Sequence, residues 1–252
     1  MKEQKKYAIS VIAGLLTIIV SSIILFSSGS YAVYTANTIR RKLPVYGVGR
    51  DDGALSISFD CAWGTGYTDK ILDTLDFYNV KATFFVVQFW AEKYPDYLKK
   101  IVGRGHEVGT HSKTHPKMSK LSAEEIEEEL KSSVAAIESV TGQKVKLFRP
   151  PFGDYDDKVI TAAENLGLYT VQWNVDSLDW KNLSAEQIAA RVIKKAGSGS
   201  IILMHNNGLH TAESLPLIFT ATQQKGLVYR PISELIYTDD FRITPDGTQI
   251  KN

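Results

Sequence analysis

Short strand-like segments alternate with segments of helical periodicity along most of this chain. Ala54–Phe59 alternates apolar and polar residues, and Thr83–Val87 is rich in β-branched and aromatic residues, so both are predicted to be strands. Between them, Ile71, Leu72 and Leu75 recur at the spacing of one helical face. This part of the chain therefore predicts a strand, a helix and a second strand in succession.

The same alternation continues toward the C-terminus. Ser122 with Glu125, and Ser184 with Gln187, are capping-box pairs that predict helix starts. Further strands are predicted at Glu107–Thr110, Leu147–Arg149, Tyr169–Trp173, Ser200–Met204 and Leu227–Tyr229, and further helices over 122–140, 158–166, 184–197 and 213–224. Such alternation is typical of an α/β fold with a parallel sheet covered by helices, and about seven strands can close into a barrel.

The N-terminus has a different pattern. Basic residues at positions 2, 5 and 6 precede an uncharged apolar run, Tyr7–Phe26. A run of about 20 apolar residues is long enough to span a bilayer, which favours an uncleaved single-pass transmembrane helix within residues 1–30 and a domain on the extracytoplasmic side. Ser30, Tyr31 and Ala32 leave a cleaved signal peptide and a secreted protein as the alternative.

The remaining boundaries follow from the periodicity. Residues 31–53 have little pattern and are predicted to be a linker, 54–240 form the domain, and 241–252 are a tail. A chain of 252 residues with 44% apolar residues suits one large domain, which we expect to be a monomer. Lys and Arg total 29 against 28 Asp and Glu, so the charge gives no indication of nucleic-acid binding.

Two histidines with metal-ligand spacing lie after the third predicted strand of the domain. His111 and His115 are four residues apart, which suits zinc, although a surface coincidence is the alternative. The intervening residues lack the glutamate of zinc proteases, and Pro116 disfavours helical geometry at His115, so the zinc-protease interpretation is rejected.

Other polar residues also follow predicted strands, where functional residues of parallel α/β folds gather. Asp60 is a candidate general base or a loop ion-pair partner, and Arg149, followed by two prolines, is a candidate partner for a carboxylate. Asp176, Asp179 and His205 complete the set, and an Asp–His pair would fix the imidazole tautomer and raise its pKa, which suits general acid catalysis.

Taken in order, these motifs resemble the polysaccharide deacetylases with a NodB-homology domain, carbohydrate esterase family 4, over about 54–235. The resemblance implies a deformed (β/α) barrel and a divalent metal, usually Zn²⁺. It implies that Asp60 is the catalytic base, oriented by Arg149, and that His205 is the general acid, tuned by Asp179. The other residues that it implicates are His111 and His115 as metal ligands, Phe152 as a backbone donor to the oxyanion, and Trp180 and Leu203 as the lining of the acetyl pocket.

Cys61 is a departure from the family pattern, which usually has a second aspartate at this position as a metal ligand. A thiolate is a good zinc ligand, so Cys61 is a candidate third ligand, with a buried hydrophobic role as the alternative. As the only cysteine it forms no intrachain disulfide. The variant sequence around it is also similar to a sporulation-associated branch of the family.

The resemblance therefore implies a metal-dependent hydrolase that removes N-acetyl groups from a cell-wall polysaccharide such as peptidoglycan. Two alternatives stay open. One is a non-catalytic glycan-binding protein with a degraded metal site, for which Cys61 is the reason. The other is an O-acetyl esterase acting on xylan-type substrates, which the same residues could serve.

Overall fold

A computed structural model describes residues 41–252 of the chain. The transmembrane helix predicted within residues 1–30, and the first part of the predicted linker, residues 31–40, lie outside these residues. Between residues 41 and 252, no helix is both long and apolar enough to cross a bilayer.

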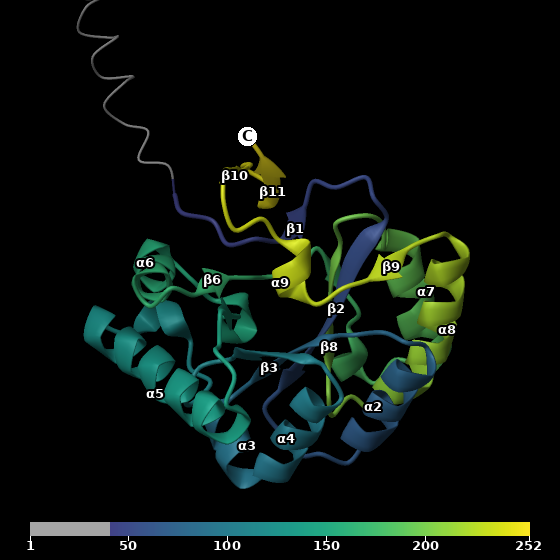
Figure 1. The fold of residues 1–252 in the computed structure, drawn as a ribbon, viewed down its shortest axis with the longest axis horizontal. Helices are drawn as coiled ribbons and strands as arrows, with labels where there is room; N and C mark the ends of the chain where they lie inside the picture. The colour runs from purple at the N-terminus through teal and green to yellow at the C-terminus, as the bar shows by residue number, and fades with distance from the viewer. Residues whose placement is uncertain (1–40) are drawn as a thin grey trace, which may run out of the picture. The chain divides into compact units, whose positions relative to one another are not determined.

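The main sheet of the described region is parallel and curves into a half-barrel (Figure 1). Its order is β6-β5-β4-β3-β2-β8-β7, and β9 pairs with β2 in addition. The strands are β2 (Ala54–Cys61), β3 (Thr83–Val86), β4 (Glu107–Thr110), β5 (Leu147–Phe148), β6 (Tyr169–Thr170), β7 (Val175–Asp176), β8 (Ile201–His205) and β9 (Val228–Tyr229). The predicted α/β class, with about seven parallel strands, is confirmed.

Helices connect successive strands and cover the outer face of this sheet (Figure 1). They are α2 (Thr68–Phe77), α3 (Gln88–Lys93), α4 (Pro95–Gly103), α5 (Ala123–Thr141), α6 (Asp157–Asn165), α7 (Ala185–Lys195), α8 (Thr211–Gln224) and α9 (Ile232–Leu235), with short 3₁₀ turns η1 (Met118–Lys120), η2 (Pro151–Gly153) and η3 (Asp179–Lys181). Both predicted capping boxes form, because each serine accepts from the backbone N–H three residues on.

Strand β2 lies in the middle of the sheet, and all eight of its residues are buried. Successive side chains of a strand point to opposite faces. The odd-numbered side chains, from Leu55 to Cys61, join the hydrophobic core under the helices. Ser58 and Asp60 point to the other face, where they contact Arg149. The alternation therefore separates an apolar face of β2 from a polar face inside the half-barrel.

The folded unit is longer at both ends than the sequence pattern predicted. It extends over Lys42–Asn252. Within the predicted linker and tail, β1 (Gly47–Val48), β10 (Phe241–Ile243) and β11 (Thr248–Lys251) form a small sheet in the order β1-β11-β10. Both segments have too few residues with regular alternation to be recognised as strands, and the pairing between them joins opposite ends of the domain.

The close packing at Gly109 in β4 gives a test of the sheet near the site. A Cβ added there would lie 2.8 Å from two ring carbons of Phe85 and 3.0 Å from the carbonyl oxygen of Leu147. We expect Gly109→Ala to lower the free energy of unfolding by about 1–3 kcal/mol in urea denaturation, because overpacking displaces the ring and the backbone. Gly103→Ala is the control, because Gly103 has open space around it; equal stability of the two variants would contradict this packing.

Candidate active site

The C-terminal ends of the parallel strands surround a pocket of about 470 Å³. Seven of the residues implicated by the sequence line it, and five further lining residues had no assigned role. The seven are Asp60, His111, His115, Phe152, Trp180, Leu203 and His205, and the five are Ala62, Trp63, Trp173, Asp176 and Asn207. The fold therefore brings together side chains that are up to 147 residues apart in sequence, from Asp60 to Asn207.

Asp60 and Arg149 form a buried ion pair at the base of this pocket. The Nη1 of Arg149 donates to Oδ1 of Asp60 and to Oγ of Ser58, at 2.8 Å in each case. Burial alone would raise the pKa of Asp60, but the Arg149 guanidinium and the nearby imidazoles outweigh burial and lower it. Asp60 is therefore an anion at neutral pH, and its second oxygen, Oδ2, does not bond to Arg149.

Arg149 is held in place from three sides. Its Nη2 donates to the backbone oxygen of Gln172 at 3.1 Å, and its guanidinium lies 4.1 Å above the ring centre of Phe85. These contacts, with the bond to Ser58, fix the direction of the guanidinium. The predicted role of Arg149 as a partner that orients Asp60 agrees with this geometry.

His111 presents one ring nitrogen to the site. Its Nδ1 lies 2.7 Å from the backbone oxygen of Arg149, so Nδ1 carries the proton and donates to that carbonyl. The Nε2 lies 3.5 Å from Oδ2 of Asp60. Because burial lowers the pKa of His111, its imidazole is neutral at pH 7, and the lone pair of Nε2 is available on the pocket side.

His115 follows in a tight loop rather than in a helix. Ser112 and His115 both have positive φ, and the Ser112 hydroxyl accepts from the His115 backbone N–H at 3.0 Å. The carboxylate of Glu129, on α5, accepts from the backbone N–H groups of Lys113 and Thr114 at 2.8 Å. Burial, followed by the charge of His111, lowers the pKa of His115 to about 4. The loop therefore holds a second neutral imidazole 5.0 Å from the first, centre to centre.

His205 and Asp179 form the predicted Asp–His pair. The Nδ1 of His205 lies 2.8 Å from Oδ1 of the fully buried Asp179, whose Oδ2 accepts from the His205 backbone N–H and from the Thr211 hydroxyl. Burial alone would lower the pKa of His205, but the hydrogen bond and charge of Asp179 raise it above 6.5. His205 is the strand partner of Asp60, so a proton acceptor and a proton donor lie side by side.

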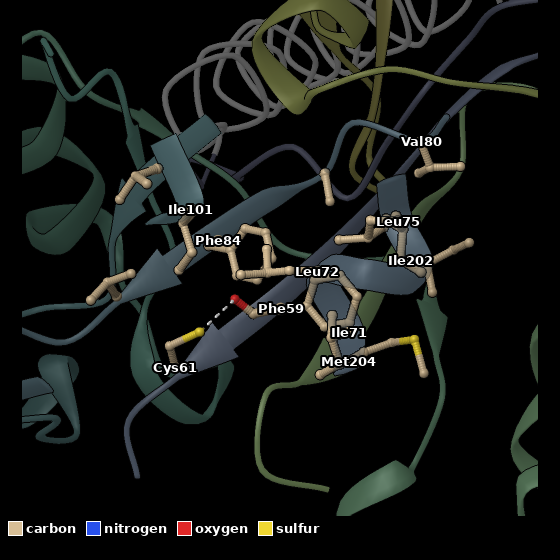
Figure 2. Packing of buried hydrophobic residues seen from close by; sticks show 14 of the residues in the cluster. Phe59, Cys61, Ile71, Leu72, Leu75, Val80, Phe84, Ile101, Ile202 and Met204 are labelled. Atoms are coloured by element: carbon tan, nitrogen blue, oxygen red, sulfur yellow. Dashed lines mark hydrogen bonds between the residues drawn. The ribbon is translucent and has the colours of Figure 1, made fainter. Parts of the chain in front are cut away.

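Cys61 is outside the site, contrary to the expectation of a third metal ligand. Its side chain belongs to the same buried hydrophobic cluster as Phe59, Ile71 and Met204, and its Sγ faces the Phe59 carbonyl at 3.8 Å (Figure 2). Burial raises the pKa of the thiol well above its usual value, so the thiolate form is strongly disfavoured. The reason is the alternation of β2, which continues through residue 61 and pairs it with Val86.

The site offers a small but chemically suitable donor set for a divalent metal. Neutral imidazoles from His111 and His115, beside the Oδ2 of Asp60, are donor types that zinc accepts. In the part of the chain that the structure describes, however, no three His, Cys, Asp or Glu side chains are grouped to hold a metal. With Cys61 turned into the core, two imidazoles are the protein ligands that fit.

The outer part of the pocket is aromatic. Phe152 and Trp180 are exposed at its rim, and Leu203 is buried in its wall. Phe152 has φ 59°, a conformation that costs a non-glycine residue of order 1–3 kcal/mol and is enriched at functional sites. Trp63 and Trp173, which also line the pocket, were not assigned from sequence, because a tryptophan after a strand does not show by itself whether it faces the core or solvent.

This chain belongs to the polysaccharide deacetylases of the NodB-homology type, carbohydrate esterase family 4. The family model described as polysaccharide deacetylase matches residues 47–171. The peptidoglycan-N-acetylmuramic acid deacetylase PdaA of Bacillus subtilis is 31% identical over 212 residues, which cover 82% of this chain and 81% of PdaA.

Two other relatives are informative because of their names. The uncharacterized protein YlxY of Bacillus subtilis is 37% identical over 77% of this chain, which spans 60% of the length of YlxY. Wild-type BA3943 of Bacillus anthracis, described as a pseudoenzyme of carbohydrate esterase family 4, is 36% identical in sequence, with a TM-score of 0.74 over 76% of this chain and 70% of that one. A mutant of BA3943 described as having restored enzymatic activity has the same TM-score.

The Asp–His pair predicts the titration of His205. We expect Asp179→Asn to lower the pKa of the His205 imidazole, because the amide removes the charge that opposes burial. The pKa is measured by NMR titration of the histidine ring protons. Asp176→Asn is the matched control and should have a smaller effect, because Asp176 contributes least among the charges that raise this pKa. An unchanged His205 titration in Asp179→Asn would contradict the pairing.

Proposed function

We propose that this domain is a metal-dependent deacetylase that removes N-acetyl groups from a cell-wall polysaccharide of the peptidoglycan type. The observation that carries this proposal is the pairing of Asp60 and His205 across β2 and β8 in one pocket, the first with a lowered pKa and the second with a raised pKa. Two groups with opposite protonation states at neutral pH are what amide hydrolysis requires of a base and an acid.

Asp60 acts as the base in this proposal. The bond from Arg149 holds its Oδ1, so the carboxylate can accept a water proton only through Oδ2, which faces the pocket. Arg149 keeps the carboxylate ionised and prevents it from rotating. Leaving Arg149 buried without this partner would cost about 3–5 kcal/mol, so the pair is also a structural requirement.

His111 and His115, whose rings are neutral and line the pocket, are the residues that would hold the metal. A divalent metal such as Zn²⁺, when bound, supplies Lewis acidity and lowers the pKa of water. Catalytic zinc sites usually have three protein ligands, whereas this pocket offers two imidazoles once Asp60 serves as base. We therefore propose that the metal is held weakly and is lost when the protein is desalted.

His205 protonates the departing amine. An amide nitrogen leaves poorly as an anion, so the acid must give up a proton as the C–N bond breaks. Asp179 fixes the ring with Nδ1 toward its own carboxylate, which leaves Nε2 as the donor on the pocket side. The hydrogen bond and charge of Asp179 raise the pKa of His205, which favours the protonated ring that this step needs.

The substrate proposal rests on the relatives. PdaA is named as a deacetylase of peptidoglycan N-acetylmuramic acid, and the peptidoglycan-N-acetylglucosamine deacetylase PgdA of Listeria monocytogenes is 34% identical over 77% of this chain, which spans 41% of the length of PgdA. An N-acetylated wall polymer is therefore the proposed substrate. Such a polymer lies outside the cytoplasmic membrane, in keeping with an extracytoplasmic domain tethered by residues 1–30.

A second candidate function is non-catalytic glycan binding. Two observations favour this non-catalytic function. Cys61 replaces the aspartate that the family usually has as a metal ligand, and its side chain lies in the core. The chain is also similar to BA3943, which is described as a pseudoenzyme. In this candidate the pocket binds acetylated sugars without turnover. The two candidates differ in whether acetate is released.

Acetate release from peptidoglycan and from N-acetylglucosamine oligomers tests the proposed function. Desalted protein should release little acetate, added zinc should restore release, and chelator should abolish it. We expect His205→Ala and His115→Ala to lose at least about 100-fold in kcat/KM, because each removes a group used in the reaction. The control is His210→Ala, whose ring is bound to Glu213 away from the pocket lining and should stay within about twofold of wild type.

The outcomes separate the candidates. No acetate release at any zinc concentration, with retained binding of the oligomers, would establish the non-catalytic alternative. Release from O-acetylated xylan oligomers in preference to N-acetylated ones would replace the amidase assignment with an esterase assignment. Circular dichroism of each variant shows whether a loss of activity reflects unfolding.

A further inference from the structure

Trp63 is a large aromatic side chain that the catalytic proposal does not use. It follows β2 directly, lines the pocket beside Asp60, and is 56% exposed. A core role is therefore excluded for this tryptophan. Exposed aromatic surface at the rim of a polar pocket is typical of a ligand-binding surface, because the apolar ring otherwise faces water.

The loop that carries Trp63 is anchored from two sides. The backbone oxygen of Gly64 accepts from the indole N–H of Trp90 at 2.8 Å and from the side-chain amide of Asn206 at 2.9 Å. Trp90 belongs to α3, and Asn206 directly follows His205 at the end of β8. The exposed ring next to this carbonyl is thus presented from a fixed backbone, which reduces the entropy lost when a ligand binds.

Trp63 also belongs to a continuous row of rings. The centre of its ring lies 5.0 Å from that of His115 in an edge-to-face arrangement, and His115 lies 4.6 Å from Phe152 in the same way. Phe152 is 64% exposed, so the two outer rings of the row offer free apolar surface beyond the reacting groups. The row thus joins His115 to two exposed rings in the pocket lining.

From this geometry we propose that Trp63 is a stacking platform for the sugar next to the one being deacetylated. One face of a β-linked N-acetylhexosamine ring carries C–H groups and packs against an aromatic ring, while its hydroxyl groups stay in water. The proposal rests on the proposed function and deepens it: the site selects a polymer over a single sugar. Trp63 acts on binding and takes no part in proton transfer.

Because Trp63 contacts His115, it could also act only as a structural support for that ring. The test must distinguish this structural role from the sugar platform. If the indole only holds His115 in position, its removal would weaken metal binding and reduce activity equally for every substrate length. If it is a platform, removal affects long substrates alone. The dependence on chain length is therefore the readout that a purely structural role would not change.

The experiment compares the N-acetylglucosamine monomer, which has no neighbouring sugar, with the tetramer for wild type, Trp63→Ala and Trp63→Phe. We expect wild type to have at least about tenfold higher kcat/KM for the tetramer, Trp63→Ala to lose most of that gain through KM, and Trp63→Phe to keep much of it. Phe77→Ala, which removes an exposed aromatic ring outside the pocket lining, is the control and should match wild type.

Calorimetric titration with the tetramer keeps this test independent of catalysis. If Trp63→Ala binds the tetramer about tenfold more weakly than wild type, the result supports the platform. This holds even if the protein releases no acetate, and in that case the proposed function fails while the platform stands. Equal tetramer affinity in wild type and Trp63→Ala, or an equal loss of activity on monomer and tetramer with weaker zinc binding, would overturn the platform.

Discussion

The buried ion pair between Asp60 and Arg149 is the interaction on which the site depends. Two charges removed from water are stable only when each meets the other in good geometry, and here the guanidinium also contacts a hydroxyl, a carbonyl and an aromatic face. The pair fixes one carboxylate oxygen and leaves the other toward His111. The same arginine supplies the carbonyl that sets the His111 tautomer, so one residue orients both the Asp60 carboxylate and the His111 ring.

The alternation of β2 determines which neighbouring side chains can join this site. Because Asp60 faces the inside of the half-barrel, Cys61 must face the helices as long as the strand continues. A metal ligand at position 61 would require the strand to end one residue earlier. The chain therefore has the paired Asp60 and His205 that the proposed function uses, while Cys61 lies in the core, and it is similar both to a protein named as a deacetylase and to one described as a pseudoenzyme.

The sequence predicted the elements with strong local signals. Periodicity located β2, β3 and β8 and the capped helices, and the placement of polar residues after strands located Asp60, Arg149 and His205. It did not locate β7, which has two residues, nor the small sheet that joins β1 with β11, because such pairing depends on tertiary contacts. The two-residue period of β2 predicts that Cys61 faces the core. The family resemblance instead suggested Cys61 as a metal ligand, because an aspartate ligand usually stands at this position.

The absorption spectrum of the cobalt(II)-loaded protein tests the division of β2 into two faces most directly. If His111 and His115 bind the metal while Cys61 lies in the core, the spectrum should show the weak visible bands of nitrogen and oxygen ligation. It should have no thiolate-to-cobalt charge-transfer band and be identical in Cys61→Ala. An intense charge-transfer band that disappears in Cys61→Ala, or no cobalt spectrum at all, would contradict this account.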